Sequence, residues 1–332
     1  MFFQTSVRMK RILTALTLLL ALAACKQGGG EKPAQYRQFP QVQVPSVYSE
    51  PEEIAQYVLG HWWDGFFSGD GATDSAAVLG VRKPEVEQAL STWLGGLESL
   101  PVADAQKLVG ELFAKLEACQ SAEPDSSLTF LRFSEMVERY LYDPNSPMRS
   151  EDLFLPFVRG LAESRWTRED MRPGYEYQAR MCAINQYGQQ VPDFAYTDAR
   201  GRRHNLYDIK AAHTLLFFSN PGCEACKEIL EALQSRPYID GMIADGGLAV
   251  INIYIDKEID KWLEYEPEYP RSWLTGYDHL FRIREEQIYD VRAIPSLYLL
   301  DAEKRVILKD APTEKAIAYL DNINSQYYGN NQ

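Results

Sequence analysis

The chain has 332 residues, of which 45% are hydrophobic and 24% are charged, with 34 Lys and Arg against 47 Asp and Glu. The apolar fraction is large enough for packed cores, so a disordered or fibrous protein is excluded. The net charge of −13 argues against nucleic acid as the main partner, because phosphate binding needs clustered cations. The length favours two folded domains over one.

The N-terminus carries an apolar run at residues 12–24, preceded by three basic residues. This run is shorter than the roughly 20 residues of a membrane-spanning helix and is typical of a secretory signal. It ends in the sequence LAAC at residues 22–25, which resembles the lipobox of bacterial lipoproteins. The resemblance implies a signal peptide over residues 1–24 and a lipid on Cys25. An ordinary signal cleaved near residue 24 is the alternative.

Lys26 follows this cysteine at the position where a common inner-membrane retention signal has Asp. We therefore expect a cell-envelope protein whose lipid is its membrane contact, with the outer membrane favoured and the folded domains in the periplasm. Residues 25–48 are rich in Gly and Pro, which is typical of a flexible tether. Disulfide chemistry is permitted in the periplasm.

Residues 49–185 are expected to form a separate all-α domain. Apolar residues recur with helical spacing over residues 54–62, 102–116 and 130–141. Ser49 and Glu52 have the spacing of a capping box at the start of the first helix. The aromatic cluster at residues 61–67 allows a binding surface, but core packing at a helix end is the favoured interpretation. This region predicts no particular chemistry.

From residue 190 to 327 the pattern changes to short apolar strands separated by turns and helices. Residues 213–219 and 248–255 are predicted buried strands, residues 296–300 and 306–308 an antiparallel pair, and residues 313–323 a last amphipathic helix. This order predicts an α/β fold in which helices flank a mixed sheet.

The chemical signal is the sequence NPGCEACK at residues 220–227, at a predicted strand-to-helix junction. A C-x-x-C in this setting indicates a redox dithiol. Cys223 would lie at the helix N-terminus, where free N–H groups and the helix dipole stabilise a thiolate nucleophile. Cys226 would lie one turn further on the same face, more buried, and would resolve the mixed disulfide. A static disulfide or half of a zinc site are the alternatives, but no second pair of zinc ligands is found in the sequence.

Residues 191–323 resemble the thioredoxin-like domain of bacterial lipid-anchored thiol-disulfide oxidoreductases of the TlpA and ResA type. The resemblance is carried by an entry strand at Asp193-Phe194, the sequence FFSNPGCEAC at 217–226 and YDVRAIPSLYLLD at 289–301. It implies that Pro295 is a cis proline packed against the dithiol and that Ile294 faces the substrate. The preceding helical domain is similar to N-terminal extensions of unknown function found before such domains.

The chain departs from the family pattern around the dithiol. Gly222 replaces the usual Trp before the first cysteine, and Glu224-Ala225 replaces the usual proline-containing pair. A carboxylate pointing at the sulfur of Cys223 would oppose thiolate formation. Phe217 stands where the family often has a buried acid, so the redox potential and the direction of electron flow stay open.

Two other features leave alternatives open. Cys119 and Cys182 are left to each other if the C-x-x-C cysteines pair, and they form either a structural disulfide or two buried free thiols. The segment at residues 257–280 is rich in Trp and Tyr and is either a substrate-facing insertion or a packed filler at the edge of the sheet.

We expect an enzyme that exchanges disulfides in exported proteins, with an unidentified redox partner that recycles the dithiol. No cofactor and no metal site is predicted. The alternative is a lipid-anchored interaction protein in which a redox-silent thioredoxin fold is a scaffold and the helical domain binds a partner.

Overall fold

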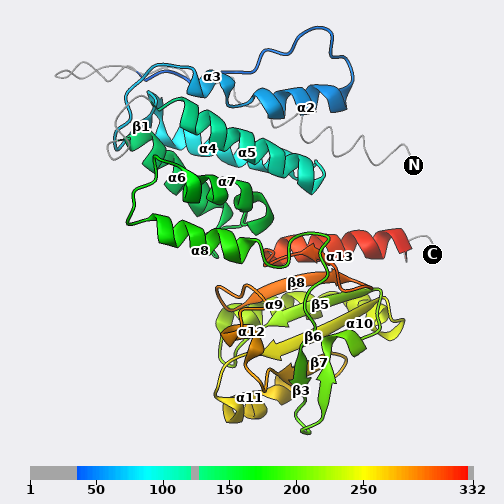
Figure 1. The fold of residues 1–332 in the computed structure, drawn as a ribbon. Coiled ribbons are helices and arrows are strands. Elements are labelled where there is room, and N and C mark those ends of the chain that lie inside the picture. The colour runs from blue at the N-terminus through cyan, green and yellow to red at the C-terminus, as the bar shows by residue number, and fades with distance from the viewer. Residues whose placement is uncertain (1–35, 121–126, 328–332) are drawn as a thin grey trace, which may run out of the picture. The chain divides into compact units, whose positions relative to one another are not determined.

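The computed structural model describes residues 36–120 and 127–327 (Figure 1). These described residues belong to one compact unit. The predicted signal peptide at residues 1–24 and the predicted lipidated Cys25 lie outside the described residues.

The first part of the described chain is helical, as predicted. Its elements are α2 (Pro51–His61), α3 (Asp64–Phe67), β1 (Ala77–Val78), β2 (Val81–Arg82), α4 (Lys83–Leu97), α5 (Val102–Ala118), α6 (Leu128–Leu141), α7 (Glu151–Glu163) and α8 (Arg172–Cys182). The strands β1 and β2 form only a short antiparallel hairpin. Ser127 and Ser150 cap α6 and α7 by accepting a backbone N–H three residues ahead. The predicted capping box of α2 is not formed, because Glu50 is its N-cap residue and makes no side-chain cap.

The helical region packs around a core of large aromatic side chains. Trp63, Trp93 and Phe133 are almost fully buried, and their rings meet edge to face. Phe66 and Phe67 are buried beside them. The core-packing interpretation is therefore confirmed for Trp63, Phe66 and Phe67, whereas His61 and Asp64 of the same cluster are exposed.

Part of the predicted tether packs on the helical region. The Arg37 guanidinium donates to the carbonyl oxygens of Leu79 at 2.5 Å and Phe66 at 2.6 Å. The Phe39 ring stacks on the Phe66 ring with 5.5 Å between the ring centroids. Pro and Gly content predicts a flexible tether, but it does not exclude contacts made by the side chains between these residues.

The second part of the described chain forms a seven-stranded mixed sheet with the order β4-β3-β7-β6-β5-β8-β9. The strands are β3 (Ala195–Thr197), β4 (Arg203–Asn205), β5 (His213–Phe218), β6 (Leu248–Tyr254), β7 (Leu274–Tyr277), β8 (Ser296–Asp301) and β9 (Val306–Leu308). The central strand β5 is parallel to β6 and antiparallel to β8. The predicted α/β fold is therefore confirmed.

Successive residues of the central strand face opposite sides of the sheet, and each side carries its own core. Leu215 and Phe217 pack with α9 (Glu224–Gln234), α10 (Pro237–Ala244) and α13 (Thr313–Tyr327). Leu216 and Phe218 pack with α12 (Arg282–Glu285) and the segment that leads into β3. The remaining short helices are η2 (Leu206–Asp208), α11 (Ile259–Tyr265) and η3 (Glu266–Glu268). This layering places the start of α9 at one end of the central strand.

Candidate dithiol site

The loop between β5 and α9 presents the two cysteines at the end of the central strand. The chain leaves β5 at Phe218 and reaches Cys223, the N-cap residue of α9, after four residues. Gly222 has a φ of +73°, a conformation that glycine adopts without steric cost. This residue turns the chain sharply enough for Cys223 to begin the helix.

Cys223 and Cys226 are joined by a disulfide with 5.2 Å between their Cα atoms. Cys223 is half-buried, whereas Cys226 is 6% exposed. The Cys226 backbone N–H lies 3.1 Å from the Cys223 sulfur and donates to it. A free N–H and the positive end of the helix dipole thus face the sulfur that solvent reaches, which is the environment that stabilises a thiolate.

The pairing of β5 with β8 places Pro295 next to this loop. In the antiparallel pairing of β5 and β8, Phe218 is opposite Ser296, so Pro295 is adjacent to the point where the loop leaves β5. The peptide bond between Ile294 and Pro295 is cis, as the resemblance implied. Ile294 and Cys223 both pack at the edge of the core that contains Cys226.

A buried polar cluster surrounds Ser219, the first residue of the dithiol loop, and the sequence analysis did not predict it. The Ser219 hydroxyl is 2.9 Å from the Tyr269 hydroxyl and accepts a hydrogen bond from the Asn252 amide at 2.6 Å. Burial raises the pKa of Tyr269 to about 12, although the hydrogen bond with Ser219 lowers it. Asn252 is the only polar residue between Leu248 and Ile253 of β6, which is the signal that could have indicated it.

A second polar contact fixes the other side of the loop. The Asn220 amide donates to the Asp256 carboxylate at 2.6 Å, and the same carboxylate pairs with Arg284. Ser219 and Asn220, the two loop residues that make these hydrogen bonds, come directly after β5. Before α9 begins, the loop is therefore connected to β6 through Asn252, to Asp256 just beyond β6, and through Asp256 to Arg284 in α12.

The Trp- and Tyr-rich segment at residues 257–280 is mainly packed structure. Trp262, Tyr269 and Trp273 are each at most 6% exposed, and the segment contributes β7 to the sheet. Of the two interpretations left open, these burials favour the packed one. Tyr269 nevertheless contacts Ser219 at the base of the dithiol loop.

Cys119 and Cys182 do not form the structural disulfide that was one of the two alternatives; both are free thiols. Cys119 follows the end of α5, where Glu117 contacts Ser164 at the end of the 13-residue helix α7, whereas Cys182 ends α8 near Glu151 at the start of α7. A helix of that length separates them by roughly 20 Å, far beyond disulfide reach. Burial raises the pKa of Cys119 to about 11 and raises that of Cys182 further.

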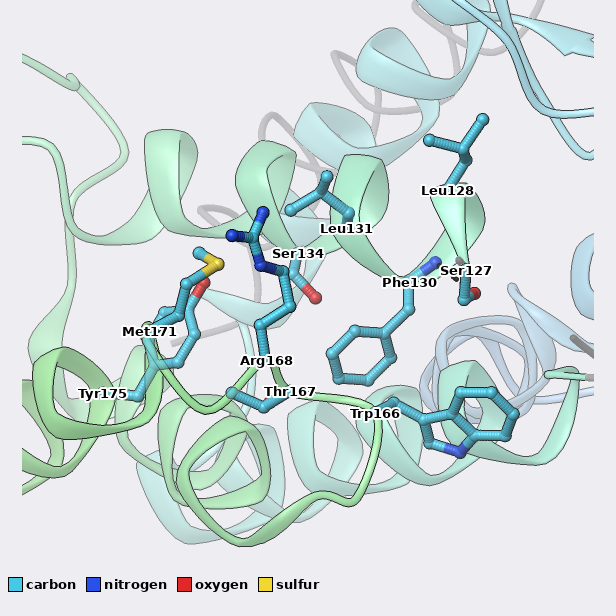
Figure 2. Close-up of a pocket in the computed structure, with 10 residues that line it drawn as sticks. All are labelled: Ser127, Leu128, Phe130, Leu131, Ser134, Trp166, Thr167, Arg168, Met171 and Tyr175. Carbon is cyan, nitrogen blue, oxygen red and sulfur yellow. Dashed lines mark hydrogen bonds between the residues drawn. The ribbon is translucent and has the colours of Figure 1, made fainter. Parts of the chain in front are cut away.

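The helical region contains a cavity of about 70 Å³, which Figure 2 shows with its lining side chains. It lies between the first turns of α6 and the segment that leads into α8. The buried Ser134 hydroxyl lines it and has no hydrogen-bond partner within residues 36–120 and 127–327. The lining residues include none of the predicted site residues.

No cluster of three or more His, Cys, Asp or Glu side chains among the described residues could hold a metal ion. No helix in the described part of the chain is long and apolar enough to cross a membrane.

The sheet, its flanking helices and the cysteine pair at the start of α9 define a thioredoxin-like protein. A crystal structure of a thioredoxin-like protein from Bacteroides caccae ATCC 43185 is 33% identical and covers 86% of this chain and 99% of its own, with a TM-score of 0.73. The "Thioredoxin-like protein YneN" of Bacillus subtilis (strain 168) is 28% identical over 129 residues, which are 37% of this chain and 69% of the relative.

The helical region has its own match. The model of the family described as "Domain of unknown function (DUF5106)" matches residues 12–182, slightly more than half of the chain. The chain belongs to the DUF5106 family, and its C-terminal part has the thioredoxin-like fold.

Proposed function

We propose that the protein is a thiol-disulfide oxidoreductase whose dithiol is Cys223 and Cys226. The observation that carries the proposal is their bonded pairing at the N-terminus of α9, with one sulfur half-buried and the other buried. A buried structural disulfide would protect both sulfurs, whereas this arrangement leaves one of them open to attack.

The exchange takes two steps. In the reduced protein the Cys223 thiolate attacks a substrate disulfide, forms a mixed disulfide and releases one substrate thiolate. The Cys226 thiolate then attacks the Cys223 sulfur, closes the Cys223–Cys226 disulfide and releases the second substrate thiolate. Two electrons have then passed from the dithiol to the substrate, and the same steps in reverse oxidise a substrate dithiol.

The substrate chain would lie along the Ile294–Pro295 turn. The turn adjoins the loop that carries Cys223, and the backbone of Ile294 precedes the cis bond. An extended substrate segment can pair with such a backbone edge, which would hold its disulfide against the Cys223 sulfur. Pro295 and Ile294 are therefore proposed as substrate-binding residues.

We further propose the cellular setting that the sequence predicts. A signal peptide at residues 1–24 and a lipid on Cys25 would anchor the protein in the cell envelope, with the outer membrane favoured. Beyond a tether at residues 25–48, of which Arg37 and Phe39 pack on the helical region, a helical domain at 49–185 and a thioredoxin-like domain at 190–327 would stand in the periplasm. The substrates would be exported proteins with disulfides, and a separate redox partner would recycle the dithiol.

The test is catalysed reduction of insulin disulfides with dithiothreitol as the electron source. Wild-type protein should accelerate the reaction, and Cys223→Ser should reduce the rate to that of dithiothreitol alone, because the attacking sulfur is lost. Cys119→Ser, which removes a thiol outside the site, is the matched control and should retain the wild-type rate. No acceleration by the wild type under reducing or oxidising conditions would favour the redox-silent scaffold instead.

A further inference from the structure

The turn that carries Pro295 is held by a largely buried arginine that reaches into the helical region. The Arg292 side chain is 11% exposed. Its Nε donates to the Glu151 carboxylate at 3.1 Å, its Nη2 donates to the Asp310 carboxylate at 2.7 Å, and its Nη1 donates to the Tyr142 carbonyl oxygen. Two of these three partners belong to the helical region, since Tyr142 follows α6 and Glu151 begins α7.

The same cluster also holds the other end of the turn. The Asp310 carboxylate accepts a hydrogen bond from the Ser296 hydroxyl at 2.8 Å, so it binds the residues on both sides of Ile294 and Pro295. Arg149, from the helical region, donates to the Asp310 carbonyl oxygen at 2.9 Å and fixes this aspartate in turn.

The cluster contains equal numbers of acidic and basic side chains, and burial raises the pKa of both Glu151 and Asp290. Six largely buried ionisable side chains meet here, three acids and three bases: Glu151, Asp290, Asp310, Arg149, Arg292 and Lys309. A planar guanidinium presents N–H donors on three separate nitrogens in a rigid fork, whereas an ammonium group donates from a single nitrogen and cannot reach the same three acceptors from the position of Arg292. The site therefore depends on arginine itself and not only on a positive charge.

We propose that Arg292 is a positioning residue that fastens the Ile294–Pro295 turn to the helical region, so that the helical region sets the substrate-binding edge of the dithiol site. This inference rests on the proposed disulfide exchange. Other contacts join the two regions without touching the turn, among them the exposed pair of Lys315 and Glu98 at 3.3 Å. They supply the control that separates positioning from general attachment.

The experiment compares Arg292→Lys and Ser296→Ala with Lys315→Met in the whole chain. Arg292→Lys keeps the charge but loses the fork of donors, Ser296→Ala frees the other end of the turn, and Lys315→Met breaks the exposed pair. Steady-state insulin reduction gives KM and kcat, equilibration with glutathione gives the dithiol equilibrium constant, and hydrogen exchange reports on peptides spanning residues 289–297.

Arg292→Lys should raise KM about fivefold or more and leave kcat within about twofold, because the turn binds substrate but takes no part in bond making. Ser296→Ala should change KM in the same direction by a smaller factor. Neither variant should change the equilibrium constant of the dithiol with glutathione. In both variants, hydrogen exchange should become faster within residues 289–297 only. Lys315→Met should leave KM and these exchange rates at the wild-type values.

Two results would overturn the proposal. One is a folded Arg292→Lys protein with wild-type KM and wild-type exchange in residues 289–297. The other is an equal loss in Lys315→Met, which would mean that any weakening between the regions acts on the turn. If wild-type protein does not reduce insulin, the proposed function fails, whereas the exchange comparison still decides whether Arg292 fastens the turn.

Discussion

At the scale of single residues, the four described cysteines occupy two contrasting environments. Cys223 caps a helix and receives a backbone N–H, whereas Cys119 and Cys182 end helices within the aromatic core region. Cys119 donates its thiol hydrogen to the Leu116 carbonyl oxygen at 3.1 Å. Position at the start or the end of a helix thus separates the proposed nucleophile from the other two thiols.

This contrast predicts a pH-dependent difference in alkylation. With a pKa of about 11, the Cys119 thiol is ionised to only about 0.1% at pH 8, and its thiolate fraction rises about tenfold per pH unit up to that pKa. Reduced folded protein treated with iodoacetamide at pH 8 should therefore be labelled at Cys223 well before Cys119 or Cys182, as peptide mass spectrometry would show. Labelling of Cys119 as fast as Cys223 at that pH would contradict the assigned environments.

At the scale of elements, the dithiol loop depends on β5, β6 and the segment after α11. The hydroxyl of Ser219 links the end of β5 to Asn252 in β6 and to Tyr269. All three residues are buried, so the loss of either hydrogen bond leaves a buried polar group that water cannot reach as a substitute partner.

Tyr269→Phe should lower the free energy of unfolding by about 1 kcal/mol, because it removes one buried hydrogen bond and little volume. Urea denaturation followed by tryptophan fluorescence measures this loss. Tyr187→Phe is the matched control, since Tyr187 is 53% exposed, and it should change stability by less than about 0.5 kcal/mol. Equal stabilities of the Tyr269→Phe and Tyr187→Phe proteins would count against a role of the buried cluster in fixing the loop.

Elements with a local signal could be predicted from the sequence. The apolar runs of β5 and β6, the pair β8 and β9, and the dithiol before α9 all follow from spacing within a few residues. The helix α4 was not predicted: Pro84 lies in its first turn and Gly95 and Gly96 lie in its last turn, so its apolar pattern is confined to the short stretch between them. The strand β7 was not predicted because its four residues include a glycine that lies directly against Tyr196.

Contacts between distant residues could not be predicted. Ser219 meets residues 33 and 50 positions away, and Arg292 meets Glu151 141 positions away. A hydroxyl, an amide or a charge in the sequence does not indicate which distant strand or helix supplies its partner. The sequence left a bridge between Cys119 and Cys182 and two free thiols as open alternatives for the same reason, and the structure has the two free thiols.

At the scale of the whole molecule, the helical region and the sheet share a buried ion cluster next to the proposed substrate turn. Lys309 extends this cluster, since its Nζ lies 2.5 Å from the Glu151 carboxylate and donates to the Met181 and Cys182 carbonyl oxygens at the end of α8. The segment before α13 is therefore bound to the start of α7 and to the end of α8. If Arg292 positions the turn as proposed, the DUF5106 region would take a structural part in the site.

The most direct measurement is capture of the mixed disulfide in the whole chain. A Cys226→Ser protein should retain a disulfide-containing substrate through Cys223, because the resolving thiol is missing, and mass spectrometry should find the substrate peptide joined to Cys223 and released by dithiothreitol. Capture that persists in a Cys223→Ser, Cys226→Ser double variant, or no adduct at Cys223 with either insulin or an exported-protein mixture, would contradict the account.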